Sequence, residues 1–128
     1  LVAKGMYMRI GNDTVIADGS TTVDLSASWT GEAVPIEHVM AFSIQLLFTG
    51  TPVGQFYLEC SSEPFDKARA SNIPSTWTTV LGSQQSISEA GDHTWNVEDS
   101  GFSWVRVKWE PSAGSGTLTK AIINTKGA

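Results

Sequence analysis

The side chains of this chain best suited to specific contacts are its five tryptophans. Trp29 has polar neighbours, Ser28 and Thr30, in a stretch with the composition of a loop. An exposed indole in a loop can stack on a sugar ring or anchor a protein interface. Trp104 shares a strand face with Arg106, whose aliphatic stem can pack beside the ring on the outer surface. Trp29, Trp104 and Arg106 are therefore candidate contact residues for a protein partner or a glycan.

A second contact surface is expected in the irregular stretch of residues 61–75. Residues 63–70 have the composition of one or two helical turns, with Pro64 near the start, where a helix tolerates proline. Long connections between strands often carry function, because the rigid scaffold positions them. Phe65 adds an aromatic side chain to this connection and is a further candidate contact residue.

Catalytic chemistry finds little support in the residue pattern. His38 and His93 lie far apart in the sequence, and neither belongs to a cluster with the spacing of metal ligands. Cys60 is the only cysteine, and it alternates with Phe56 and Leu58, so we expect a small buried side chain rather than a nucleophile. No G-x-S-x-G turn is present to expose a serine. We therefore expect a protein that is not an enzyme and that needs no cofactor.

Two acidic clusters raise the question of a calcium site. Carboxylates and loop carbonyls are the oxygen ligands that calcium requires. Asp and Asn are also the usual residues of tight turns, and we favour that interpretation over an ion site. The two clusters are Asn12 and Asp13 with Asp18, and Glu98 and Asp99 with Asp92.

The composition fits one ordinary domain over residues 1–128, with residues 1–5 as a flexible arm. Only 16% of the residues are charged, and the net charge is −5. The eight Lys and Arg residues are scattered and form no basic stripe, which argues against a nucleic acid or an anionic membrane surface as partner. No apolar run reaches the roughly 18 residues of a membrane-spanning helix.

Short alternating segments separated by turn residues predict an all-β fold with little helix. In the segment AFSIQLLF, apolar residues recur with a period of two from Phe42 to Phe48, which predicts a half-buried strand. In WVRVKW, we expect Val105, Val107 and Trp109 to face inward. The predicted strands are residues 6–10, 14–17, 21–25, 41–48, 55–60, 76–81, 85–87, 93–97, 104–109 and 117–124. Trp77, Trp95 and Trp109 fit this alternation and are predicted to lie in the core.

Among these segments we count roughly eight strands, a number typical of an antiparallel β-sandwich or jelly roll. The Thr-Gly-Thr-Pro sequence of residues 49–52 predicts a hairpin that joins 41–48 to 55–60. The Pro, Ser and Gly residues between 111 and 116 likewise predict that 117–124 turns back and pairs antiparallel with 104–110.

Two stretches resemble the discoidin, or coagulation factor 5/8 C, pattern. They are FYLECSSEPFDKARASNIPSTWTTVLGS and SGFSWVRVKW. In that family a strand ending in Ser precedes a loop and a W-T-x-V strand, and an R-Y-V-R-V strand comes before the last one. The resemblance covers about half of the chain. It implies a jelly roll that binds glycans or lipids through loops at one end.

The second half of the chain also resembles small structural proteins of tailed bacteriophages, which carry a W-x-x-I/V … S-x-S … G … W/Y-N-V-x-x-x-G-x-x-W-V-R-V-x-Y … S-G-x-G-x-L run and a closing K-G. The matching positions are Trp77, Val80, Ser86, Ser88, Gly91, Trp95, Asn96, Val97, Gly101, Trp104, Val105, Arg106, Val107, Gly114, Gly116 and Leu118. The family often has tyrosine at the position of Trp109. The resemblance implies a virion component, either a capsid decoration (cement) protein on the major capsid protein or a part of a tail.

These observations lead to one expected function and one alternative. We expect a non-enzymatic virion protein on the capsid or tail surface that stabilises the shell and self-associates, with a homo-trimer as the natural symmetric assembly. The alternative is a carbohydrate-binding module of discoidin-like architecture, free or within a tail fibre. That alternative requires an exposed aromatic residue, for which Trp29 and Trp104 are the candidates.

Overall fold

The computed structural model describes residues 14–17, 22–36, 39–64, 73–98 and 101–127, and in these ranges the chain is all-β with no helix. Every pair of strands is antiparallel, and all of them belong to one hydrogen-bonded network. The predicted fold class is confirmed. The strands are β1 (Thr14–Ala17), β2 (Val23–Asp24), β3 (Trp29–Thr30), β4 (Val34–Pro35), β5 (Val39–Ser61), β6 (Thr78–Thr79), β7 (Gln85–Ile87), β8 (Gly91–Val97) and β9 (Trp104–Gly127).

The network is organised around two long strands, β5 and β9, which pair with each other along their whole length. Their register runs from Val39 opposite Gly127 to Ser61 opposite Trp104. The short strands β1 to β4 follow the outer edge of β9. The strands β6, β7 and β8 follow the outer edge of β5. Four antiparallel ribbons therefore lie side by side, with the last ribbon of the chain between the first and the second.

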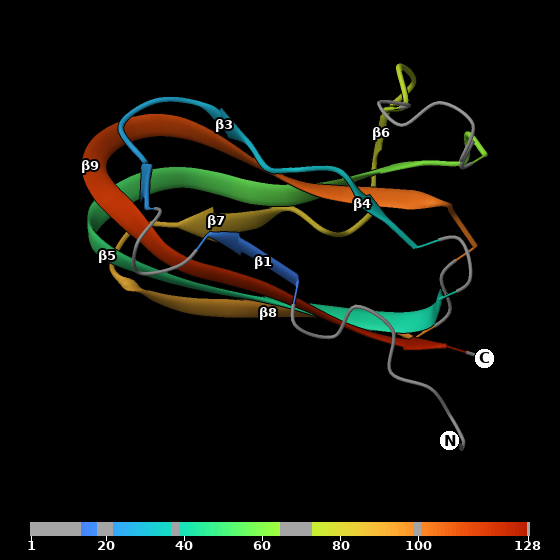
Figure 1. The fold of residues 1–128 in the computed structure, drawn as a ribbon. Coiled ribbons are helices and arrows are strands. Elements are labelled where there is room, and N and C mark those ends of the chain that lie inside the picture. The colour runs from blue at the N-terminus through green and yellow to red at the C-terminus, as the bar shows by residue number, and fades with distance from the viewer. Residues whose placement is uncertain (1–13, 18–21, 37–38, 65–72, 99–100, 128) are drawn as a thin grey trace.

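All four ribbons fold over near their middle, so that the network closes into two packed layers (Figure 1). The first layer contains β1 and β2, residues 117–127 of β9, residues 39–48 of β5, and β8. The second contains β3 and β4, residues 104–110 of β9, residues 54–61 of β5, and β6 with β7. If these segments are numbered one to eight along the chain, the layers read 1-8-3-6 and 2-7-4-5. That order is a jelly roll.

The two predicted hairpins are wrong, because their turn residues bend a strand instead of reversing it. Residues 41–48 and 55–60 both belong to β5, and residues 104–110 and 117–124 both belong to β9. The two bends lie opposite each other, with Gly50 paired to Gly116 and Pro52 paired to Gly114. Gly and Pro thus mark a sheet corner here, which has the same local composition as a tight turn.

Several shorter strands differ from their predicted bounds. Residues 85–87 form β7 as predicted, and 93–97 lie within β8. Among the described residues of the predicted strand 21–25, residues 23–24 form β2, and within 76–81 residues 78–79 form β6. The predicted loop at Trp29 is wrong, since Trp29 pairs with Trp109 in β3. The predicted strand 6–10, the arm 1–5 and most of the helical turn at 63–70 lie outside the described residues.

The core fills the space between the two layers. The period-two residues Phe42, Ile44, Leu46 and Phe48 are at most 4% exposed, and Val105, Val107 and Trp109 are fully buried, all as predicted. The ring of Trp109 lies 4.5 Å from that of Phe56, between centroids. Its indole nitrogen donates a hydrogen bond to the carbonyl of Leu25 at 2.8 Å. A buried indole needs such a partner, so Trp109 ties the first ribbon to the centre of the core.

The corner between the layers requires glycine. Gly114 has a φ of +71° and Gly50 a φ of +86°, a region that residues with a Cβ rarely adopt. A Cβ on Gly50 would lie 2.8 Å from the Cα of Gly116, and one on Gly114 would overlap the carbonyl oxygen of Thr51. The two strands therefore touch backbone to backbone where they bend.

We expect Gly114→Ala to lower the free energy of unfolding by about 2–4 kcal/mol, because strain at positive φ adds to a backbone clash. Gly82→Ala serves as a control for φ alone, since Gly82 has a φ of +81° and nothing within 4 Å of an added Cβ. It should cost about 1 kcal/mol. Chemical denaturation measures both. Equal losses at the two positions would contradict the close packing of the corner.

Candidate functional site

The outer face of the second layer gathers the largest group of interacting polar and aromatic side chains. On this face the register places Tyr57 opposite Lys108 and Glu59 opposite Arg106. We call this surface the Arg106 face, and it consists of Tyr57, Glu59, Trp77, Arg106, Lys108 and Glu110. Its position follows from strand alternation, because the neighbouring residues Phe56, Leu58, Val105 and Val107 point into the core.

Arg106 is held from two directions. Its Nε and Nη2 atoms both lie 2.7 Å from Oε1 of Glu59. Its guanidinium carbon lies 4.1 Å from the centre of a ring of Trp77, which is cation–π geometry. The Arg106 and Glu59 side chains are 21% and 16% exposed, so solvent screens the pair only in part. Arg106, a predicted contact residue, is thus fixed in one orientation at the surface.

The predicted position of Trp77 is wrong, and this residue belongs to the Arg106 face. We predicted Trp77 for the core, but it is half-buried and lies outside the core cluster. Its indole nitrogen donates a hydrogen bond to the carbonyl of Pro74 at 2.8 Å. The strand that follows Trp77, β6, is only two residues long. Alternation along so short a strand could not indicate whether Trp77 faces the core or the outer surface.

The two tryptophans predicted as exposed contacts are not surface aromatics. Trp104 shares the outer face with Arg106, as expected, yet it is only 4% exposed. Its indole nitrogen donates a hydrogen bond to the carbonyl of Glu63, in the chain that leaves β5, at 3.1 Å. Trp29 is half-buried and packs against the core cluster. Phe65, the remaining candidate, lies outside the described residues.

Further hydrogen bonds hold the rest of the Arg106 face. The hydroxyl of Tyr57 donates to Oε2 of Glu110 at 3.2 Å, and Lys108 Nζ donates to Oγ1 of Thr30 at 2.8 Å. Burial raises the pKa of Tyr57, and the hydrogen bond to Glu110 raises it further. Tyr57 therefore stays protonated and neutral at physiological pH. These contacts hold the polar side chains of the Arg106 face in place through partners within the chain.

Cys60 is half-buried, whereas we expected full burial. It lines an open hollow of about 390 Å³, together with hydroxyl side chains and Glu63. Burial raises the pKa of the Cys60 thiol, with a smaller contribution from Glu59. A thiol with a raised pKa is mostly protonated at neutral pH and is a poor nucleophile.

Glu63 organises the segment next to this hollow. Its Oε2 accepts hydrogen bonds from the backbone amides of Ser75 and Thr76 at 2.9 and 2.7 Å. The bond from Thr76 is the main cause of the lowered pKa of Glu63. Glu63 thus ties the chain that leaves β5 to the chain that enters β6.

A third feature lies on the opposite side of the molecule and was not anticipated. The outer face of the first layer contains a hollow of about 310 Å³. Its lining residues come from β8, β5 and β9 and from the residue that follows β8. They are Ala41, Phe42, Ser43, Asn96, Glu98, Asn124 and Lys126. Alternation marks Ser43 as outward-facing, but only the register between strands shows that Asn96 and Asn124 flank it.

Metal-binding geometry is not found in the described ranges, where no group of three or more His, Cys, Asp or Glu residues could hold an ion. Of the two acidic clusters, Asn12, Asp13, Asp18 and Asp99 lie outside the described residues. Within those same ranges, there is no helical segment with the length and hydropathy needed to span a bilayer.

Comparison with protein-family models found no match for the chain, and a search among curated proteins found none either.

His93 is the described residue whose charge is most sensitive near neutral pH. Its ring meets that of Trp95 edge to face, with centroids 4.7 Å apart. Burial lowers the pKa of His93 below its usual 6.5, although the nearby Asp92 opposes this. The folded state therefore favours the neutral imidazole.

This environment predicts an acid-dependent loss of stability. The contribution of His93 is present above pH 6.5 and is lost as the pH falls through the lowered pKa of the folded state. We expect the unfolding free energy of His93→Gln to fall less steeply than that of wild type between about pH 7.5 and about pH 5. Chemical denaturation across this range measures the difference. Parallel curves for the two proteins would show that His93 is not the responsible group.

Proposed function

We propose that this protein is a non-enzymatic structural component of a bacteriophage virion, a decoration or cement protein that binds the major capsid protein and stabilises the shell. The observation that carries the proposal is the Arg106 face on a jelly-roll sandwich. Jelly rolls serve as virion shell domains, and also as lectins and cupins, so the fold alone does not choose among these roles.

The Arg106 face has the chemistry of a protein interface. Tryptophan, tyrosine and arginine dominate the binding energy of protein interfaces. Here Arg106 and Trp77 are already in contact, and Glu59 holds the guanidinium. A surface fixed before binding loses little side-chain entropy when a partner docks. The flat outer face of two paired strands also suits the many weak contacts that repeated copies sum into avidity.

The resemblance to phage structural proteins supports the same choice. Its pattern includes Val105, Val107 and Leu118, which are fully buried, and Gly114 and Gly116, which form the corner. Part of the shared pattern therefore consists of residues that build this sandwich. Arg106 belongs to the same pattern. Self-association, with a homo-trimer as its symmetric form, is part of the proposal.

The discoidin-like alternative loses its aromatic anchors. Trp104 is 4% exposed and Trp29 packs against the core, so neither offers an open ring for a sugar. We therefore do not propose a glycan site at these tryptophans.

Gradient sedimentation of the native source material tests the proposal directly. We expect the chain to travel with large particles at a fixed ratio to the major shell protein, with mass spectrometry as the readout. Recovery of the chain only as a small species at the top of the gradient would overturn the virion assignment.

A second prediction concerns the contact surface. Arg106→Ala should weaken rebinding of the purified chain to shells stripped of it by about tenfold or more, because an interface arginine typically contributes over 1 kcal/mol. Lys120→Ala is the matched control, since Lys120 is an exposed cation on the outer face of the first layer. Thermal unfolding confirms that both variants are folded. Equal loss of binding in both variants would show that the contact with the shell does not depend specifically on the Arg106 face.

A further inference from the structure

The hollow on the first layer is built by three neighbouring strands in register. Ser43 of β5 lies between Asn96 of β8 and Asn124 of β9. In the adjacent row Ala41 pairs with Lys126, and Glu98 follows β8 on the opposite side. On this outer face β5 thus carries short side chains, whereas the flanking residues carry longer ones. A depression forms along β5 because alanine and serine cannot fill the space between them.

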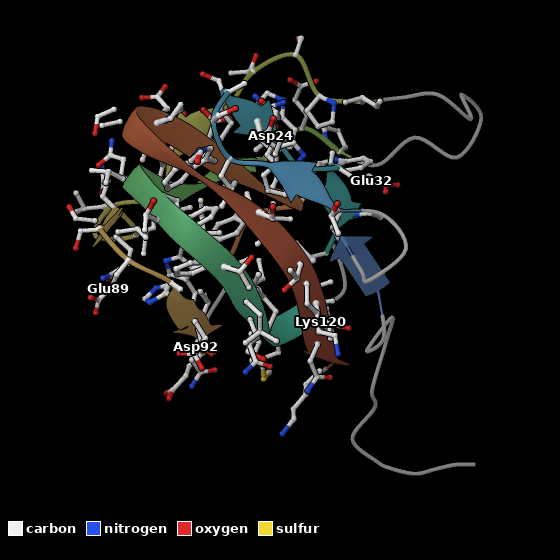
Figure 2. The ribbon with its side chains drawn as sticks, turned by 90° about the vertical axis from the view of Figure 1, so that its left-hand side faces the viewer. Asp24, Glu32, Glu89, Asp92 and Lys120 are labelled. Atoms are coloured by element: carbon white, nitrogen blue, oxygen red, sulfur yellow. The ribbon has the colours of Figure 1, made fainter. Side chains whose placement is uncertain are left out.

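A pattern of charge accompanies this shape. Acidic residues lie on the β8 side of the face and lysines on the β9 side. Figure 2 shows this arrangement for Asp92 and Lys120, which lie on either side of β5, and the register pairs both with Leu47. Glu98 and Lys126 repeat it beside the hollow. One acid and one base balance each other, so the lining has no net charge that would select an anion or a cation.

The lining is rich in groups that both donate and accept hydrogen bonds. The amides of Asn96 and Asn124 and the hydroxyl of Ser43 each do so. In the part of the chain that the structure describes, the side chains of Ser43 and Asn96 have no hydrogen-bond partner. Both keep their capacity for a ligand. Adjacent sugar hydroxyls also donate and accept together, and side chains of this kind complement them.

We propose that this hollow binds a neutral pyranose ring of a glycan. Its volume of about 310 Å³ is at the lower end of ligand-sized pockets, which suits a monosaccharide unit rather than a long oligosaccharide. Asn96, Ser43 and Asn124 bind the ring hydroxyls, and Glu98 and Lys126 bound the ring at one end. This site is distinct from the loop tryptophans of the discoidin-like alternative.

The site does not depend on the virion assignment, but the two fit together in space. The Arg106 face belongs to the outer side of the second layer and the hollow to the outer side of the first. The two surfaces of a sandwich point in opposite directions (Figure 1). A molecule docked through the Arg106 face therefore presents the hollow away from its partner.

Two-dimensional amide NMR of the intact chain tests the proposal. The probes are the methyl pyranosides of glucose, galactose, mannose and N-acetylglucosamine. We expect at least one of them to cause saturable shifts of the amides around Ser43, Asn96 and Asn124. Absence of shifts with all four sugars, or shifts confined to the Arg106 face, would overturn the assignment of this hollow.

Variants locate the binding. Asn96→Ala should weaken binding of the responsive sugar by about tenfold, the effect of losing one well-placed hydrogen-bonding group. Gln45→Ala is the matched control, because Gln45 is an exposed amide on the same face of β5, outside the hollow lining. The NMR spectrum itself shows whether each variant is folded. Unchanged affinity in Asn96→Ala would also contradict the proposal. The gradient experiment tests the virion role separately.

Discussion

The backbone contact between β5 and β9 at the sheet corner is the constraint on which the rest of the structure depends. Gly50 lies against Gly116, and Gly114 lies against Thr51, so the two strands bend together while remaining paired. Side chains at these positions would separate the strands at the point where they must stay in contact. Because both strands stay paired across the corner, with a register shift on each side of it, one ribbon supplies the centre of both layers. The core and two opposite outer faces follow from that single arrangement.

Much of the fold could be predicted from local pattern, because burial alternates along a strand whichever neighbour the strand has. This is why Phe42 to Phe48 and Val105 to Trp109 were correctly assigned to the core. Partner choice was not predictable by the same means. Residues 49–52 and 111–116 have the composition of turns, and a corner and a hairpin use the same residues. In a hairpin, the two segments that flank the turn pair with each other. Here they pair instead with segments of the other long strand, which is distant in sequence.

The same distinction between local pattern and strand pairing applies to the candidate surfaces. Arg106 was identified because its position on an outward strand face is a local property. Trp104 was misplaced because its burial depends on a segment distant in sequence, which includes Glu63. Trp77 was misplaced because the strand that follows it, β6, is too short for alternation to indicate a face. The hollow around Ser43 could not be predicted, since Asn96 and Asn124 meet it only through the register of three strands. Sequence pattern thus indicates which side chains point outward, and register decides which of them act together.

The position of β9 within the sheet has a consequence for biosynthesis. β9 is the last strand of the chain, yet it lies between the first ribbon and β5 and pairs with both. Neither layer can be completed before β9 has been synthesised, because β9 joins the first ribbon to β5 in both layers. Nearly all of its pairing is also between residues far apart in sequence, which is the topology of slow folders. Until β9 is available, β1 to β4 and one edge of β5 lack their pairing partner, and such unpaired edges can associate with other chains.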